Sequence, residues 1–174
     1  METKTPKFNW FSGYPPPDLE IKQVYGLLFT DCERLLLFVA QGGDFSLPGG
    51  TPEPYDVGIA DTLRRETLEE VNTEIEEPVY VGYQVCEGEN FAQVRMTAMI
   101  REIKPAQPDP ATGLVYKRLL AVPKKAIELL GWHDTGAAQI NAAVEIARKK
   151  FNVSITKCTK CFGEPSKENE KIFL

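Results

Sequence analysis

Residues 46–73 read SLPGGTPEPYDVGIADTLRRETLEEVNT and contain the strongest pattern in this chain. From Ile59 to Val71 no residue breaks a helix, and Gly58 stands at the predicted start. At 3.6 residues per turn, four residues share one stripe that would face a core: Ala60, Leu63, Thr67 and Val71. We therefore predict a helix over residues 59–71 that packs against the domain through this stripe.

Three carboxylates lie beside the stripe. Glu66, Glu69 and Glu70 stand at i, i+3 and i+4, so their side chains converge on one side of the predicted helix. Like charges this close repel one another unless they are fully solvated or surround a hard cation, and oxygen ligands of this type suit Mg²⁺ or Mn²⁺. An ordinary amphipathic helix with a solvated acidic face is the alternative interpretation.

The same stretch resembles the Nudix box, whose pattern is G-x5-E-x7-R-E-U-x-E-E-x-G-U, with U a bulky apolar residue. Its combination of glycines, spacing and charges is specific, although the box covers only a small part of the chain. Two segments carry the resemblance: Arg65, Glu66, Glu69 and Glu70 match the R-E-U-x-E-E core, and Leu47-Pro48-Gly49-Gly50 matches the segment that commonly leads into the box.

The chain also departs from the box pattern. The spacing between the second glycine and the arginine is one residue longer than the pattern allows. The first glutamate of the box has no clean counterpart, because Val57 takes its place and Asp56 stands alongside as the candidate substitute. Thr67 replaces an apolar residue. Asn72 replaces the closing glycine, which is a mild change because Asn also tolerates a left-handed helix end.

The resemblance implies both a fold and an activity. The expected fold is α/β, a Nudix-like α/β/α sandwich with a mixed β-sheet between helices. The expected activity is the divalent-metal-dependent hydrolysis of a pyrophosphate bond in a nucleoside diphosphate linked to another moiety, X, with Mg²⁺ or Mn²⁺ as the cofactor. A catalytically silent Nudix-fold module that binds or senses a nucleotide is the alternative, and the resemblance does not identify X.

The resemblance also assigns roles to residues. Glu66 is the expected general base or partner of the metal-activated water, and Arg65 is expected to orient a box glutamate. The implied metal ligands are the carbonyl of Gly49 and the carboxylates of Glu66, Glu69 and Glu70.

Residues outside the box supply further candidates. In similar enzymes an acidic residue beyond the box often completes the metal site or acts as base, and Glu87 and Glu89 at the tip of a predicted hairpin are candidates. Arg95, on the strand predicted after that tip, is either a paired structural arginine or a phosphate contact. His133, the only histidine, is predicted to be a structural hydrogen-bonding residue rather than a catalytic one.

Length and charge bound the function. The chain has 174 residues and a formal net charge of −5, so we expect a single Nudix-like domain. It has no long basic run, which argues against general nucleic-acid binding, because such binding relies on Lys and Arg to neutralise phosphates. A small-molecule nucleotide is the expected partner, and a homodimer stays open. No apolar stretch suits a signal peptide or a membrane span, so a cytoplasmic location is expected.

The remaining elements are predicted from alternation, turn residues and helix stops. Residues 1–19 are expected to be irregular but docked through their aromatic residues, and residues 152–174 to form a loosely attached tail beyond a core at about 20–150. A connector is expected at 132–134. The predicted strands are 21–30, 35–40, 45–47, 79–86, 91–103 and 114–121, and the predicted helices after the box are 124–130 and 135–150.

Four cysteines divide into two pairs. Cys32 and Cys86 lie near predicted strand ends and are expected to be small packing residues. Cys158 and Cys161 form a lone CxxC, and a zinc site normally needs a second ligand pair, so two reduced cysteines are expected there. A small zinc or redox module in the tail is the alternative.

Overall fold

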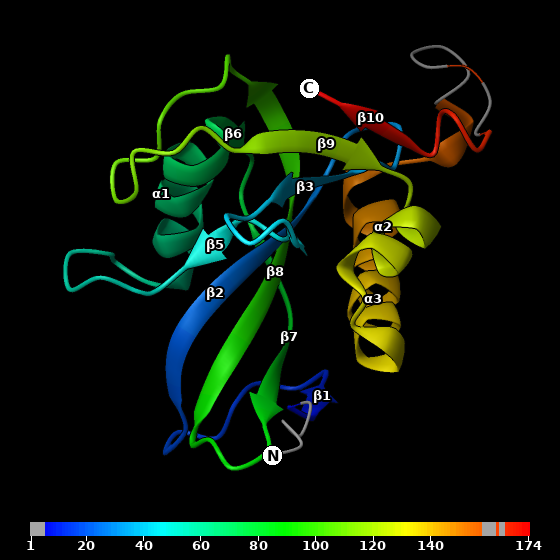
Figure 1. Ribbon diagram of the computed structural model, residues 1–174. Coiled ribbons are helices and arrows are strands. Elements are labelled where there is room, and N and C mark those ends of the chain that lie inside the picture. Colours follow the sequence, from blue (N-terminus) through cyan, green and yellow to red (C-terminus); the bar gives the residue numbers. More distant parts are fainter. Residues whose placement is uncertain (1–5, 158–162, 164–165) are drawn as a thin grey trace, which may run out of the picture.

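The computed structural model describes residues 6–157, 163 and 166–174. Figure 1 shows a mixed β-sheet with one helix on one side and two helices on the other, which confirms the α/β/α sandwich predicted from the sequence. The helices are α1 (Ile59–Val71), α2 (Pro123–Leu130) and α3 (His133–Phe151). The strands are β1 (Phe8–Phe11), β2 (Glu20–Phe29), β3 (Leu35–Val39), β4 (Phe45–Ser46), β5 (Gly49–Gly50), β6 (Thr73–Ile75), β7 (Val79–Cys86), β8 (Phe91–Ile103), β9 (Lys117–Ala121) and β10 (Lys171–Phe173).

The sheet has the principal strand order β1-β7-β8-β2-β3-β9-β10, and its centre is the parallel pair β2 and β8. Along β2, Leu27 and Phe29 belong to the core under α2 and α3, whereas Val24 and Leu28 belong to the core under α1. Both faces of the sheet are therefore buried. This burial explains why β3 reads as the unbroken apolar run LLLFV instead of alternating with polar residues.

Helix α1 packs through the stripe predicted from its periodicity. Leu63, Thr67 and Val71 are buried, and Ala60 packs at the edge of the same core. The helix ends at Asn72, which takes the left-handed conformation with φ of 43° and bonds its backbone N–H back to the last turn. Asn therefore closes the helix as expected for a residue in the position of the box glycine.

The two helices on the other face cover the core with small and branched residues. The prediction of a connector at 132–134 was wrong in part, because α3 begins at His133. Gly131 ends α2 in the left-handed conformation, and the Trp132 carbonyl already accepts the N–H of Gly136 at 3.1 Å, so helical bonding starts earlier than the sequence suggested.

No helix in the described residues is long and apolar enough to cross a membrane.

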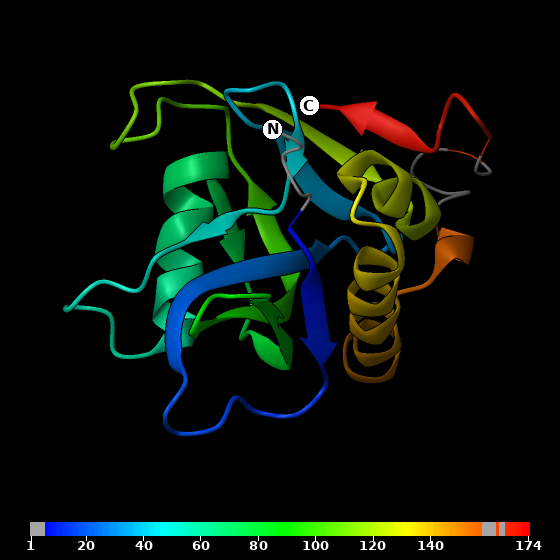
Figure 2. The ribbon, with the colours of Figure 1, turned by 60° about the horizontal axis from the view of Figure 1, so that its bottom comes forward.

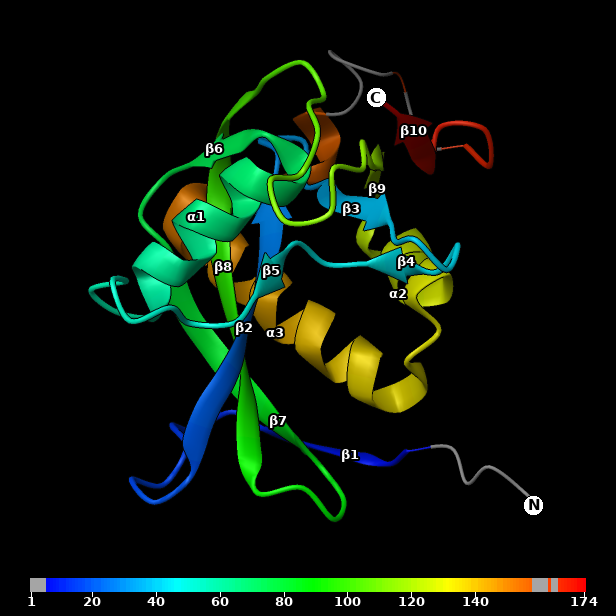
Figure 3. The same ribbon diagram turned by 60° about the vertical axis from the view of Figure 1, so that its left-hand side comes forward.

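Strands β2 and β3 separate soon after their turn, and this separation positions the Gly-Gly segment. They pair only at Phe29 and Leu35. The first half of β2 pairs instead with β5, with Tyr25 opposite Gly49 and Val24 opposite Gly50. Figure 3 shows β5 lying beside β2 and close to α1. The start of the box is therefore held against the middle of the central strand.

The N-terminal segment is more regular than predicted. β1 pairs with the edge of β7, because an open sheet edge presents unpaired N–H and C=O groups that another strand can satisfy (Figure 2). The aromatic docking was predicted correctly: Phe11 stacks on Tyr83 with ring centroids 4.9 Å apart, and Tyr14 stacks on Tyr80 at 4.2 Å.

The C-terminal segment also differs from its prediction. Its end forms β10, which pairs with the edge of β9, and Val153 is buried in the core under α3. A 3₁₀ turn at Ile155–Lys157 lies between α3 and β10. The description of residues 152–174 as loosely attached is therefore wrong for these described parts, and strand pairing at a free sheet edge again supplies the physical reason.

Candidate active site

The two glycines of β5 let the box helix approach the central strand. The backbone N–H of Gly49 donates to Glu70 Oε2 at 2.8 Å. A Cβ on Gly49 would lie 2.2 Å from the carbonyl oxygen of Val24, and a Cβ on Gly50 would lie 2.4 Å from the carboxyl group of Glu66. A side chain at Gly49 would clash with β2 and one at Gly50 with Glu66 of α1, so the Gly-Gly pair allows both β2 and the box carboxylates to approach this segment closely.

Arg65 ties the acidic side chains together. Its Nε and Nη2 donate to the two carboxylate oxygens of Asp56 at 3.1 and 3.0 Å. Its Nη1 donates to Glu66 Oε1 at 2.8 Å and to Glu69 Oε2 at 3.1 Å. The arginine therefore orients two box glutamates. Asp56 is a further acidic partner of Arg65, in a chain that lacks the first glutamate of the box pattern.

Burial and hydrogen bonding set the charge states of this cluster. The hydrogen bonds from Arg65 hold the pKa of Asp56 well below its usual range, and Asp56 in turn raises the pKa of Arg65. Burial raises the pKa of Glu66, with Arg65 opposing that rise. Burial also raises the pKa of Glu70 to about 8, against the opposing hydrogen bond from Gly49. The carboxyl groups therefore outnumber the one arginine, and Glu70 is mainly protonated at neutral pH while no cation is bound.

The donor chemistry of the cluster suits a hard divalent cation, since it consists of carboxylate oxygens with a surplus of negative charge. The side chains nevertheless have other partners. Glu66 and Glu69 are bonded to Arg65, and Glu70 is bonded to Gly49. As they stand, no three His, Cys, Asp or Glu side chains in the described part of the chain are arranged to hold a metal ion. A cation would have to compete with Arg65 for these carboxylates.

Asp109 is an acidic neighbour that the sequence did not reveal. It lies in the loop that precedes β9, and its negative charge helps to raise the pKa values of Glu66 and Glu70. The residue is buried, and its Oδ1 accepts the backbone N–H groups of Ala111 and Thr112 at 2.7 and 3.0 Å. Figure 3 shows this loop curving back beside α1. The sequence marks only a proline-rich loop here, so no local pattern could have placed Asp109 near the box.

The candidates at the hairpin tip do not reach the box. Glu87 and Glu89 are exposed at the turn between β7 and β8, and Figure 1 shows this turn at the end of the sheet far from α1. Glu87 instead lies on the rim of a cavity on the other side of the sheet. The structure therefore offers Asp109, and not the hairpin tip, as the acidic residue beside the box.

That cavity lies between the sheet, β1 and the start of α3, and has a volume of about 620 Å³. Tyr25, Arg95 and Trp132 are among the residues that line it. Tyr25 is also the strand partner of Gly49, so the cavity adjoins the box directly. Arg95 makes no ion pair with a carboxylate of the described residues, which leaves the alternative of a ligand contact that the sequence had raised.

The remaining candidates lie outside this arrangement. His133 is exposed on the rim of the cavity, and it is the first residue of α3 rather than part of a connector. Cys32 is buried and Cys86 is partly buried, in agreement with a packing role. Cys158 and Cys161 lie outside the described residues, so the interpretation of the CxxC stays a prediction from sequence.

Comparison with known proteins defines the family. A family model described as the NUDIX domain matches residues 21–114, which is more than half of the chain. Among solved structures, the pyrophosphohydrolase BsRppH of Bacillus subtilis aligns with a TM-score of 0.64 at 15% identity, covering 80% of this chain and 91% of that chain. A MutT structure from a study of Aliivibrio salmonicida and Vibrio cholerae gives a TM-score of 0.53 at 11% identity, covering 71% and 94%. No curated protein matches the chain.

The chain therefore belongs to the Nudix family, as the pattern in residues 46–73 predicted. The enzyme class predicted from the sequence, a Nudix-type hydrolase of acid anhydrides, follows from this membership. The solved structures add agreement in fold, since likeness at such low identity is evidence of fold alone.

Proposed function

We propose that this chain is a divalent-metal-dependent hydrolase that cleaves a pyrophosphate bond in a nucleoside diphosphate linked to another moiety, X. The observation that carries the proposal is the convergence of Glu66, Glu69 and Glu70 beside the Gly-Gly segment, with Arg65 orienting two of them. We further propose that residues 1–174 act as one Nudix-like domain. The cytoplasmic location and the homodimer stay predictions.

The chain's own residues have distinct parts in this proposal. Glu69, Glu70, Glu66 and the carbonyl of Gly49 would hold Mg²⁺ or Mn²⁺, which neutralises phosphoanhydride charge and lowers the pKa of the attacking water when bound. Glu66 Oε1 is held by Arg65, so its other oxygen is the one placed to accept a proton from that water. Asp56 fixes the guanidinium plane through two hydrogen bonds and thereby positions both glutamates.

A second candidate function has one observation in its favour. Arg65 already donates hydrogen bonds to Glu66 and Glu69, and this chain lacks the first glutamate of the box. A module that binds nucleotides without turnover would also have these features. The two functions differ in a single measurable property, which is multiple turnover in the presence of a divalent cation.

The test is a hydrolysis screen with Mg²⁺ and with Mn²⁺ over ADP-ribose, dinucleoside polyphosphates, NADH, CoA and oxidised nucleotides, with products identified by mass. We expect turnover of at least one compound, cleavage within its diphosphate, and no turnover in EDTA. Binding of these compounds without any product would contradict the hydrolase and favour the silent module.

A further inference from the structure

The cavity beside the box contains a buried positive charge that no carboxylate in the described part of the chain matches. Arg95 is 1% exposed, and within the described residues none of its hydrogen bonds goes to a carboxylate. Burial lowers its pKa only to about 10, so the side chain is charged at neutral pH. Buried charges in proteins are normally paired, because removing an isolated ion from water is costly. Arg95 is therefore an exception that calls for a physical explanation.

The contacts of Arg95 orient its guanidinium without neutralising it. Its Cζ atom lies 4.8 Å from the ring centroid of Tyr25 and 5.5 Å from that of Trp132. Its Nε donates to Gln139 Oε1 at 2.7 Å, and Nη1 makes only long contacts, of 3.4 to 3.5 Å, with backbone carbonyls of β8. The guanidinium therefore lies over two aromatic rings, and its Nη edge keeps donor capacity for a further acceptor.

A chain of amides continues from this arginine across the sheet. Gln139 Nε2 donates to Gln84 Oε1 at 2.7 Å, Gln84 Nε2 donates to Gln93 Oε1 at 2.6 Å, and Gln93 donates in turn to Gln23. Arginine can only donate, so it fixes the direction of every amide in the chain. The network satisfies these buried polar groups but adds no negative charge, so Arg95 has no counter-ion within residues 6–157, 163 and 166–174.

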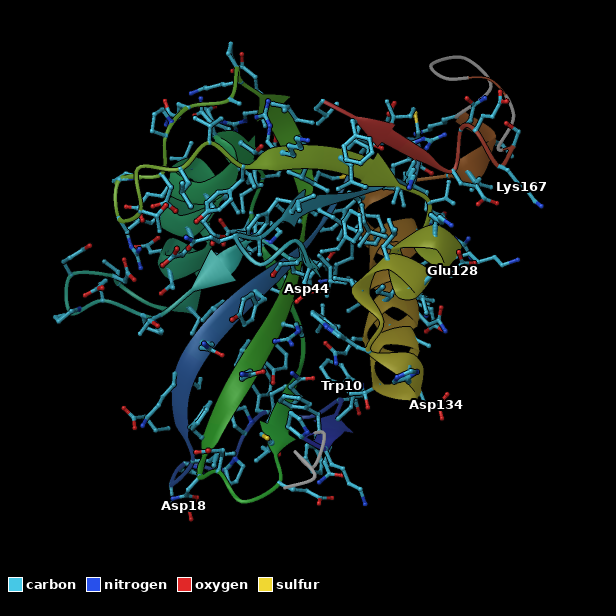
Figure 4. The ribbon with its side chains drawn as sticks, in the orientation of Figure 1. Trp10, Asp18, Asp44, Glu128, Asp134 and Lys167 are labelled. Atoms are coloured by element: carbon cyan, nitrogen blue, oxygen red, sulfur yellow. The ribbon has the colours of Figure 1, made fainter. Side chains whose placement is uncertain are left out.

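The mouth of the cavity adds to this field. The first turn of α3 begins there without a capping side chain, and a helix start favours negative charge. His133 and Lys7 lie on the rim, together with the exposed Glu87. Figure 4 shows Trp10 beside the lower end of α3 and Asp134 at that end of the helix. Glu87 and Asp134 are thus exposed at the surface, whereas the cation inside the cavity is buried.

We propose that this cavity binds a negatively charged group, a phosphate or a carboxylate, carried by the moiety X, with Arg95 as its counter-ion. The inference rests on the proposed function for its substrate, since Tyr25 joins the cavity to Gly49 and so to the box. A substrate would then place its diphosphate at the carboxylates of α1 and a second anion at Arg95. The preferred X is therefore acidic and not neutral.

The test uses pairs of compounds that differ by one acidic group. NADPH with NADH tests a phosphate, with 2′-phosphoadenosine as the X linked to the nicotinamide nucleoside diphosphate, and UDP-glucuronate with UDP-glucose tests a carboxylate on X. For at least one pair we expect kcat/KM to favour the acidic member by about 10- to 100-fold, as for a hydrogen bond between charged groups. Calorimetric titrations of the same pairs in EDTA measure the preference in binding without catalysis.

Two variants separate the charge of Arg95 from its packing. Arg95→Gln removes the charge, and Gln139→Glu leaves Arg95 in place but puts a carboxylate at the 2.7 Å acceptor position. Both should abolish the preference for the acidic member. Gln139→Glu also removes the amide that donates to Gln84, so circular dichroism should first show that both variants are folded. Arg148→Gln is the control for charge, because it removes a positive charge from the same helix at an exposed arginine paired with the buried Glu33, and it should keep the preference.

The outcomes distinguish this inference from the proposed function. If some compound is hydrolysed but the neutral member of every pair does equally well, the anion site is wrong and the hydrolase stands. A preference that persists in both Arg95→Gln and Gln139→Glu also overturns the anion site. If nothing is hydrolysed but the acidic members bind more tightly in EDTA and lose that advantage in both variants, the anion site stands and the hydrolase is wrong.

Discussion

Two arginines, one on each side of the central strand β2, have opposite surroundings. Arg65 on α1 donates to three carboxylates and to the carbonyl of Thr51. Arg95 on β8 donates to one amide and, over longer distances, to two backbone carbonyls, and its Cζ lies over the rings of Tyr25 and Trp132. The box therefore has surplus negative charge, whereas the cavity has surplus positive charge.

This difference shows how the surroundings of an arginine determine its role. Arg65 uses its donors within the protein, so it can position other side chains but has little capacity for a ligand. Arg95 keeps its Nη edge for an acceptor from outside, because its strongest internal contacts involve Nε and the ring faces. Tyr25 joins the two regions through its strand pairing with Gly49, and a substrate that spans both would correct both charge imbalances.

The largest effect is expected from removing charge on the box side. Glu69→Gln and Glu70→Gln keep side-chain volume but remove a carboxylate from the proposed cation site, so turnover should fall by more than about a hundredfold, beyond the usual cost of losing a supporting residue. Circular dichroism should show an intact fold in both. Glu76→Gln, which alters only an exposed pair with Arg101, is the control. Wild-type rates in both box variants would place the metal site elsewhere.

A smaller loss is expected when the positioning arginine is replaced. Lysine carries its donors on one nitrogen and cannot reach Asp56, Glu66 and Glu69 together, so Arg65→Lys should lower kcat/KM by about 10- to 100-fold. The neighbouring Arg64→Lys is the matched control, because Arg64 pairs with Asp61 and Glu77 at the surface. Steady-state kinetics on the best substrate measures both, and an equal loss in the two variants would argue against a special role for Arg65.

Cation binding should stabilise the box but not the cavity. A ligand that binds only the native state adds about 2.7 kcal/mol to the unfolding free energy at a hundredfold excess over Kd. Mg²⁺ alone should give a smaller shift, because it competes with Arg65 for Glu66 and Glu69 and lacks the phosphates that complete its shell. Thermal melts in EDTA, in Mg²⁺ and in Mg²⁺ with a non-hydrolysable nucleotide measure this. Equal shifts in Glu69→Gln would exclude the box from cation binding.

The smallest expected effect is a pH dependence of stability in EDTA. Burial raises the pKa of Glu70 from 4.5 to about 8, so between these pH values the native state binds more protons than the unfolded state. The unfolding free energy should therefore rise as pH falls from 8 toward 5, by at most about 1.4 kcal/mol per pH unit for one proton. Denaturant titrations across this range measure the slope. Glu70→Gln should flatten it, and an unchanged slope would assign the proton to another group.

The sequence by itself determined the elements whose cause is local. The helix over residues 59–71 was predicted with its observed bounds, because its stripe and its asparagine end depend on neighbours three and four positions away. The strands of both hairpins and the convergence of the three glutamates were predictable for the same reason. Patterns of this kind also sufficed to identify the family before any contact was known.

Only the tertiary structure decided which distant residues meet. Asp56 became the bidentate partner of Arg65, Asp109 came beside Glu66 and Glu70, and β1 and β10 found the free edges of the sheet. The sequence did not determine whether a carboxylate pairs with Arg95. The structure instead places Tyr25, Trp132 and Gln139 around its guanidinium. These contacts join segments far apart in the chain, and they depend on the strand order and on the separation of β2 from β3, which no local spacing encodes.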